Sequence, residues 1–267
     1  MKFRLLFIIF NVVILASFLL IFLMPAFVLG WEYTSVFWST NWPVGLVFLI
    51  VLGALNGYFA YNWRVFTLLE REDWDALIGY LETVVMEKKR FTRQRVRILV
   101  NAYVVKGRIE KIGDLESFLR DVRPNLVPRL AIELGLPHLL SNDGERMVGY
   151  FGEMKDREGV SDPVWVRWCY AFALMTAGRY DEAKGQLAAV HEETRDPLLR
   201  VLTAHMLEPF GSQDEEIAQR VKDERETLRS KLTRDRIDRE LERQRQNLQV
   251  LFLTSRIEEA RDWVFPS

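Results

Sequence analysis

The sequence has little of what most enzymes need. It contains a single cysteine, Cys169, so no intramolecular disulfide can form, and a lone thiol among apolar neighbours fits an inert core residue in a reducing compartment. It has no GxxxxGK[ST] phosphate loop, no GxSxG elbow, no HExxH pair and no CxxC pair. Three histidines, His138, His191 and His205, have no metal-ligand spacing. We therefore predict a protein that is not an enzyme and holds no metal or cofactor.

Charge is missing from one part of the chain. The formal net charge of the 267 residues is −1, which gives no reason to expect a nucleic-acid partner. The stretch from position 1 to position 61 is nearly free of charge, whereas the remainder carries almost all the acidic and basic side chains. The sequence therefore predicts two different environments, one apolar and one aqueous.

The uncharged region contains two apolar runs. Residues 5–29 follow Lys2 and Arg4, and at about 1.5 Å per residue they exceed the roughly 30 Å hydrocarbon core of a bilayer. A signal peptide is the competing interpretation, but its apolar region is about 7–15 residues long and is followed by small residues at a cleavage site. We expect a retained span instead.

A second span is predicted at residues 43–61, opened by Pro43. The predicted connection, residues 30–42, has Glu32 as its only charge and several tryptophan and tyrosine side chains suited to a membrane interface. Lysine and arginine flank the hairpin and are absent from its connection, so both termini are expected in the cytoplasm of an inner (cytoplasmic) membrane protein. Residues 1–62 form the predicted transmembrane hairpin.

Small and polar residues mark one face of the second span. Gly53 and Gly57 have GxxxG spacing and Asn56 lies between them. Such glycines let helix backbones approach closely, and an intramembrane Asn needs a hydrogen-bond partner. This face is expected to seat the first span, with a homodimer contact as the alternative.

After the hairpin, the chain is organised around residues 161–197. Two helical stretches flank a turn at Gly178, with Tyr180 just after it and small residues, Ala171 and Ala183, inside the two helices. This pattern resembles a tetratricopeptide (TPR) repeat, a pair of antiparallel helices with a period of about 34 residues. The resemblance implies a solenoid of stacked hairpins that binds other proteins.

A nearly constant spacing supports the resemblance. Equivalent buried positions in the second helices recur at intervals close to the TPR period, through Leu77, Ile112, Val148, Ala183 and Ile217. A generic helical-hairpin solenoid of similar period is the alternative. No strand-like alternation with turn signals is found, so we predict an all-α protein whose residues 63–211 form a TPR-like solenoid.

The last part of the chain, residues 212–267, differs in composition. Residues 214–248 are rich in charge of both signs and contain no Gly or Pro, which predicts a long helix. It is expected to cap the solenoid, with a bend near residues 247–254 and with Trp263 and Phe265 as anchors. A coiled-coil arm is the alternative.

The resemblance also implies a binding groove lined by the first helices of successive repeats. The positions that would face it are Arg97, Asn101, Glu133, Trp165, Trp168 and Phe172. Arg97 and Asn101 resemble the basic residue and Asn with which some TPR domains hold a peptide carboxylate. The aromatic residues favour an apolar peptide groove, or else they pack beneath the C-terminal helix.

A basic cluster lies close to the predicted membrane spans: Lys88, Lys89, Arg90, Arg93, Arg95 and Arg97. It is interpreted either as a surface for anionic lipid or as a solvated connection.

We expect a membrane-anchored scaffold that docks partner proteins through a cytoplasmic solenoid. The alternative is a structural subunit of a larger inner-membrane assembly, held by the hairpin and the C-terminal helix, with an oligomeric contact through either.

Overall fold

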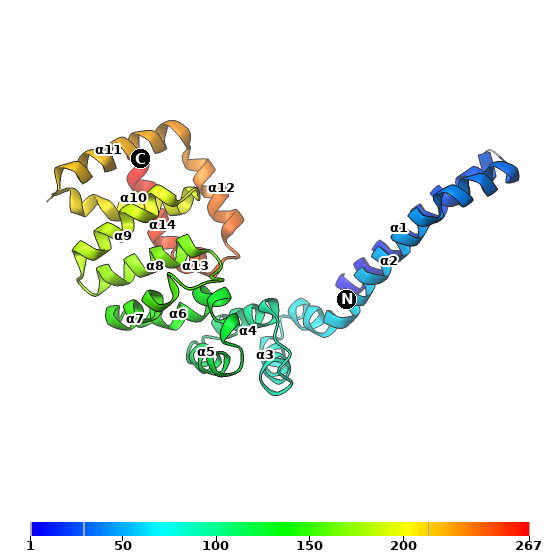
Figure 1. The fold of residues 1–267 in the computed structure, drawn as a ribbon, viewed down its shortest axis with the longest axis horizontal. Coiled ribbons are helices and arrows are strands. Elements are labelled where there is room, and N and C mark those ends of the chain that lie inside the picture. The colour runs from blue at the N-terminus through cyan, green and yellow to red at the C-terminus, as the bar shows by residue number, and fades with distance from the viewer. Residues whose placement is uncertain (1, 29, 213, 267) are drawn as a thin grey trace. The chain divides into compact units, whose positions relative to one another are not determined.

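A computed structural model describes residues 2–28, 30–212 and 214–266. Within these ranges every regular element is helical and there is no strand, which confirms the predicted all-α class (Figure 1). The chain divides into two compact units, Met1–Tyr80 and Leu81–Ser267.

The first unit is built on two long helices, α1 (Lys2–Val28) and α2 (Trp31–Glu70). They pack antiparallel: Asn56 Nδ2 donates to Asn11 Oδ1 at 2.8 Å, and the Phe18 and Phe48 rings stack at 4.2 Å. Both helices are long and apolar enough to cross a membrane. The side chains of Lys2 and Arg4, which the predicted topology uses, lie outside the described residues.

The connection between these helices is shorter than predicted. Residues 30–42 were expected to form it, but α2 already begins at Trp31, after Gly30 with a φ of 86°. Ser39 Oγ donates to the Val36 carbonyl and the Trp38 ring lies edge-on to Phe22 at 5.2 Å, so this stretch is a helix packed on α1. Pro43 lies inside α2 because only one backbone N–H is lost there and the surrounding turns supply their own bonds.

The prediction that Gly53 and Gly57 form the packing face for the first span is also wrong. A Cβ added at Gly53 or Gly57 would meet nothing within 4 Å, and both glycines are exposed. Gly45 provides the close approach instead, with Phe22 Cε1 at 3.2 Å from the position of an added Cβ. Asn56 does find a partner, the Asn11 side chain of α1.

The helix α2 runs beyond residue 62, where the predicted hairpin ends. A turn at residues 71–73 then leads into α3 (Trp74–Glu82), and Asp73 Oδ1 accepts from the Ala76 N–H at its start. A π-helical turn, Thr83–Glu87, follows directly.

The second unit is a series of helices that pack in chain order. Its helices are α4 (Arg93–Val105), α5 (Glu110–Val122), α6 (Ala131–Ser141), α7 (Gly144–Met154), α8 (Pro163–Thr176), α9 (Tyr180–Glu193), α10 (Pro197–Leu207) and α11 (Glu215–Lys231). Each contacts the next, and α6 also contacts both α4 and α8. Short 3₁₀ turns fill two of the connections, with Pro124–Leu126 and Pro128–Leu130 between α5 and α6 and Glu208–Ser212 between α10 and α11.

Glycines end two of the first helices of these hairpins. Gly107 and Gly178 have φ values of 68° and 74°, a region that costs little only for glycine. The N–H groups that follow them, of Arg108 and Arg179, donate to the carbonyls of Tyr103 and Leu174, which closes the helix ends. The turn at Gly178 lies where the sequence predicted it.

Three of the five predicted core positions in the second helices are fully buried, namely Leu77, Ile112 and Ala183. Val148 and Ile217 are only half-buried, and Met147 and Val221 occupy the core in their place. Val221 lies one helical turn beyond Ile217 on nearly the same face, whereas Met147 lies about 100° around the helix from Val148, so the packing of α7 turns a different face to the core.

The predicted long C-terminal helix is divided. After α11 come α12 (Arg234–Gln244), α13 (Leu248–Phe252) and α14 (Thr254–Val264). The bend near residues 247–254 is present, but an additional break falls at Leu232 and Thr233, whose side chain caps α12. The break lets α12 and α14 both pack against α10, as Figure 1 shows for α14 in red. Trp263 and Phe265 are half-buried, whereas Ile257 and Val264 provide the buried anchors.

Candidate functional site

The N-terminal ends of α4, α6, α8 and α10 surround one cavity of about 380 Å³, which we call the first-helix cavity. Residues from the end of α12 and from α13 complete its lining. Its lining includes the side chains of Arg97, Glu133, Trp165, Asp196, Asn247 and Gln249. Because these positions are scattered from 97 to 249 in the sequence, only the stacked fold brings them together.

Polar contacts tie the C-terminal segment to this cavity. Arg97 donates through Nη2 to Asn247 Oδ1 at 3.1 Å, and its Nε lies 3.5 Å from Glu133 Oε1. Trp165 Nε1 donates to Asp196 Oδ2 at 3.3 Å, and the same carboxylate caps α10 by accepting from the Leu198 N–H. The wall is therefore a set of fixed hydrogen-bonding groups.

Two polar side chains in the wall are largely buried and line the cavity. Glu133 is 8% exposed, and burial raises the pKa of its carboxyl although Arg97 and Arg93 oppose the shift. Gln249 is also 8% exposed. Both can form hydrogen bonds to a polar ligand that enters the cavity.

Five of the six predicted groove residues line two different cavities, and the sixth lines neither of them. Arg97, Glu133 and Trp165 line the first-helix cavity, while Trp168 and Phe172 line a second cavity of about 240 Å³ beside α10. Asn101 lines neither cavity, and its buried Oδ1 has no hydrogen-bond partner among the described residues. Arg97 and Asn101 therefore do not act together on one cavity here.

The aromatic residues are largely withdrawn from solvent. Trp168 is 1% exposed, and its ring stacks on Phe172 with 5.5 Å between centroids. Arg256 of α14 lies at the same cavity as these two rings. This arrangement agrees with the interpretation in which the aromatic residues pack beneath the C-terminal segment.

Sequence reasoning missed the contribution of Asp196, Gln244, Asn247 and Gln249. Asp196 precedes Pro197, an arrangement typical of a helix start, and this could have placed it at the beginning of a first helix. Nothing local predicts the other three. Gln244 reaches Asp196 at 3.4 Å only because α12 returns to α10.

The predicted basic cluster also divides. Lys88, Lys89, Arg90 and Arg93 are exposed, and they make no ion pair within 4.0 Å with a described residue. Arg95 is buried at 8% exposure, and Arg97 belongs to the first-helix cavity. The exposed four are named the basic segment below.

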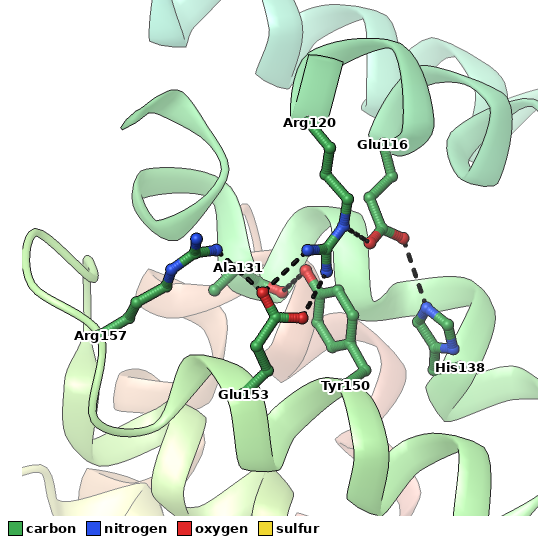
Figure 2. A network of polar contacts seen from close by, with 7 residues as sticks. All are labelled: Glu116, Arg120, Ala131, His138, Tyr150, Glu153 and Arg157. Carbon is green, nitrogen blue, oxygen red and sulfur yellow. Dashed lines mark hydrogen bonds and ion pairs between the residues drawn. The ribbon is translucent and has the colours of Figure 1, made fainter. Parts of the chain in front are cut away.

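A separate polar network joins α5, α6 and α7 (Figure 2). Arg120 holds Glu153 through two bonds of 2.8 and 2.9 Å and donates through Nε to the buried Glu116 at 2.7 Å. His138 Nε2 lies 3.4 Å from the other Glu116 oxygen. Burial opposes ionisation of Glu116, but the bonds from His138 and Arg120 outweigh it and lower its pKa. The geometry is that of a helix-to-helix brace.

The described residues contain no group of three or more His, Cys, Asp or Glu side chains able to hold a metal ion. Complete burial raises the pKa of the Cys169 thiol to about 12, so the thiol stays protonated at neutral pH.

These features define a class: a helical protein with two apolar N-terminal helices and a unit of helices packed in chain order, closed by its own C-terminus. A family model described as "Uncharacterised Treponema protein" matches residues 111–266, and the chain belongs to that family. It is 25% identical over 258 residues to an "Uncharacterized protein" of Treponema pallidum (strain Nichols), with 92% of this chain and 81% of that protein covered. No solved structure matches.

Proposed function

We propose that the protein is a membrane-anchored scaffold whose TPR-like solenoid docks a partner protein at the first-helix cavity. The observation that carries the proposal is that cavity, where four successive first helices present fixed polar groups beside the largely buried Glu133 and Gln249. A docked peptide segment would bond to these groups through its backbone amides and side chains.

The two apolar helices supply the anchor in this proposal. Both chain ends lie on the cytoplasmic side of an inner membrane, because lysine and arginine follow the second span and are absent from the short connection. Anchoring confines the partner near the bilayer, which raises its effective concentration without any new contact. The activity is binding, without catalysis.

The C-terminal segment regulates access in this scheme. Asn247 holds Arg97, and Gln244 reaches Asp196, so a partner either binds alongside α13 or displaces it. Arg97→Ala removes both the contact with Asn247 and the partial counter-ion of Glu133. It is expected to change partner recovery at least several-fold while the helical content stays unchanged.

Site-specific photo-crosslinking in living cells tests the proposal. A photoreactive residue replaces the exposed Asp162 at the cavity rim, and a matched control replaces the exposed Asp121 on α5, which lines none of the cavities described above. We expect a discrete heterologous adduct from position 162 and not from position 121. Equal adduct patterns from the two positions would contradict docking at the cavity.

A second candidate function, a structural subunit of a larger membrane assembly, is favoured by one observation. Gly53 and Gly57 leave an exposed, close-approach face on α2 that α1 does not fill. If this face holds the assembly together, the double substitution Gly53→Leu/Gly57→Leu will lower the molecular mass of the assembly that is extracted in detergent. Ala54→Leu, at an exposed neighbouring position, will leave the mass unchanged. An unchanged mass for the double variant removes this candidate.

A further inference from the structure

The basic segment combines exposure with a lack of ion pairs, and its Arg93 also lines the first-helix cavity, where it opposes the raised pKa of Glu133. Residues 88–97 read KKRFTRQRVR and contain no acidic residue. Of the six basic side chains in this stretch, the four of the basic segment (Lys88, Lys89, Arg90 and Arg93) point to solvent and make no ion pair with a described residue. Some exposed arginines elsewhere in the second unit do have carboxylate partners, among them Arg157, Arg220 and Arg243.

The backbone holds these charges in place. After the π-helical turn, the Lys88 N–H donates to the Thr83 carbonyl at 2.9 Å and the Arg90 N–H to the Val84 carbonyl at 3.0 Å. Lys89 adopts a φ of 50°, an uncommon conformation for a residue with a long side chain. The basic segment is thus presented by an ordered connection rather than by a flexible tail.

The neighbouring residues fix the far side of this connection. The Phe91 ring lies 6.1 Å from the Phe118 ring, and the Thr92 hydroxyl caps α4 by accepting from the Arg95 N–H at 3.2 Å. Arg95 itself bends back to the Arg90 carbonyl. One side of the connection is therefore used by packing, and the charged side chains occupy the other.

Chain geometry keeps the basic segment near the end of the second apolar helix. Most of the chain between Glu70 and Lys88 is helical, as Trp74–Glu82 and Thr83–Glu87. With about 1.5 Å per helical residue and about 3.5 Å for each of the others, Lys88 cannot lie farther than about 35 Å from Glu70. A bilayer crossed by α2 is thus always within reach.

We propose that the basic segment binds the anionic headgroups of the bilayer into which the protein is inserted, and so docks the second unit on the membrane surface. This inference rests on the membrane anchoring in the proposed function. A Lys or Arg close to an anionic leaflet favours the docked state by about five-fold per residue, so four together make docking the main state. Nucleic-acid binding is less well supported than lipid binding, because the rest of the chain is not basic.

Lysine acylation in nanodiscs tests the proposal with the full chain. The protein is reconstituted in phosphatidylcholine alone or in equal parts phosphatidylcholine and phosphatidylglycerol, and briefly treated with a water-soluble acylating ester. Mass spectrometry then compares Lys88 and Lys89 with Lys222 and Lys231, which are exposed on α11. We expect the relative acylation of the first two to fall at least about five-fold in the anionic discs. In about 0.5 M NaCl the difference should largely disappear, because salt at that strength screens charges beyond about 4 Å.

A charge-matched pair of variants isolates the cause. Arg90→Gln/Arg93→Gln keeps both reporter lysines and is expected to remove most of the protection. Arg146→Gln/Arg239→Gln removes the same charge from α7 and α12 and is expected to leave the protection intact. A similar loss of protection in both variants would show that only net charge matters, which overturns a role for this surface.

The other outcomes separate this inference from the proposed function. Release of the protein from the discs by an alkaline carbonate wash would refute membrane anchoring itself. A retained protein whose Lys88 and Lys89 react equally in both lipids refutes the lipid-binding surface alone. Protection that depends on added soluble cell extract rather than on phosphatidylglycerol would overturn lipid binding and assign the basic segment to an acidic protein partner instead.

Discussion

Replacing Arg120 by methionine tests whether the network in Figure 2 holds the hairpins together. The substitution keeps most of the side-chain volume but removes the Arg120 bonds to Glu116 and Glu153, leaving His138 at Glu116 and Arg157 at Glu153. The Arg120 and Glu153 side chains are 34% and 43% exposed, so their pair contributes only about 0.5–1 kcal/mol. Glu116 is 8% exposed, and the loss of its shortest bond costs about 1.5–3 kcal/mol more.

The total, about 3 kcal/mol, corresponds to a Tm lowered by about 6–12 °C for a unit of this size. Thermal melting followed by circular dichroism in a mild detergent measures it. Arg157→Met is the matched control, since it removes only an exposed bond to Glu153 and is expected to cost under about 1 kcal/mol.

A second substitution identifies the cause of the loss. Glu116→Gln in the Arg120→Met background removes the uncompensated buried charge and is expected to recover about 1 kcal/mol or more. The loss should also shrink as the pH falls below 4.5, because Glu116, whose pKa is lowered in the folded wild type, then becomes protonated in every state. Equal Tm losses for Arg120→Met and Arg157→Met, or no recovery in the double variant, would refute the reasoning.

Three further predictions concern single positions. Gly144→Ala places a Cβ 2.4 Å from the Ala177 backbone nitrogen and is expected to cost at least about 2 kcal/mol in an unfolding experiment, whereas Gly149→Ala in the same helix has open space and should stabilise by about 0.5–1 kcal/mol. Glu133→Gln should raise the Tm at neutral pH, because the pKa of Glu133 is raised in the folded protein and the wild type therefore loses stability as this carboxyl ionises. The gain in Tm should vanish towards pH 4.5, and a gain that persists there would contradict the prediction. Burial lowers the pKa of His191, so the wild type should lose stability as the pH falls below 6.5 because the unfolded chain takes up the proton first; His191→Gln should give a shallower decline in Tm over that range.

The fold was predictable where local chemistry determines it. Gly178 marks a helix end because few other residues tolerate a positive φ, and the sequence predicted that turn. The break at Thr233 was missed because the packing of both α12 and α14 on α10 is a tertiary effect that no local pattern records. Pro43 misled because proline is usual at a helix start, yet α2 continues through it from Trp31 to Glu70.

The candidate site was predictable only in part. The repeat spacing placed Arg97, Glu133 and Trp165 on first helices, and these three do line one cavity. Their polar partners Asn247 and Gln249 lie far beyond Trp165 in the sequence, and a period of about 34 residues says nothing about a segment outside the repeats. The Arg120–Glu153 bond was missed because it joins different second helices, α5 and α7, which only the stacking of the hairpins brings together.

The return of the C-terminal segment to α6 and α10 has a consequence for biosynthesis. The wall of the first-helix cavity is completed by Asn247 and Gln249, which leave the ribosome after all of its other lining residues. Until then the polar groups of the earlier helices face water or a chaperone. A chain cut upstream of residue 247 would therefore display an unfinished cavity even where its hairpins form.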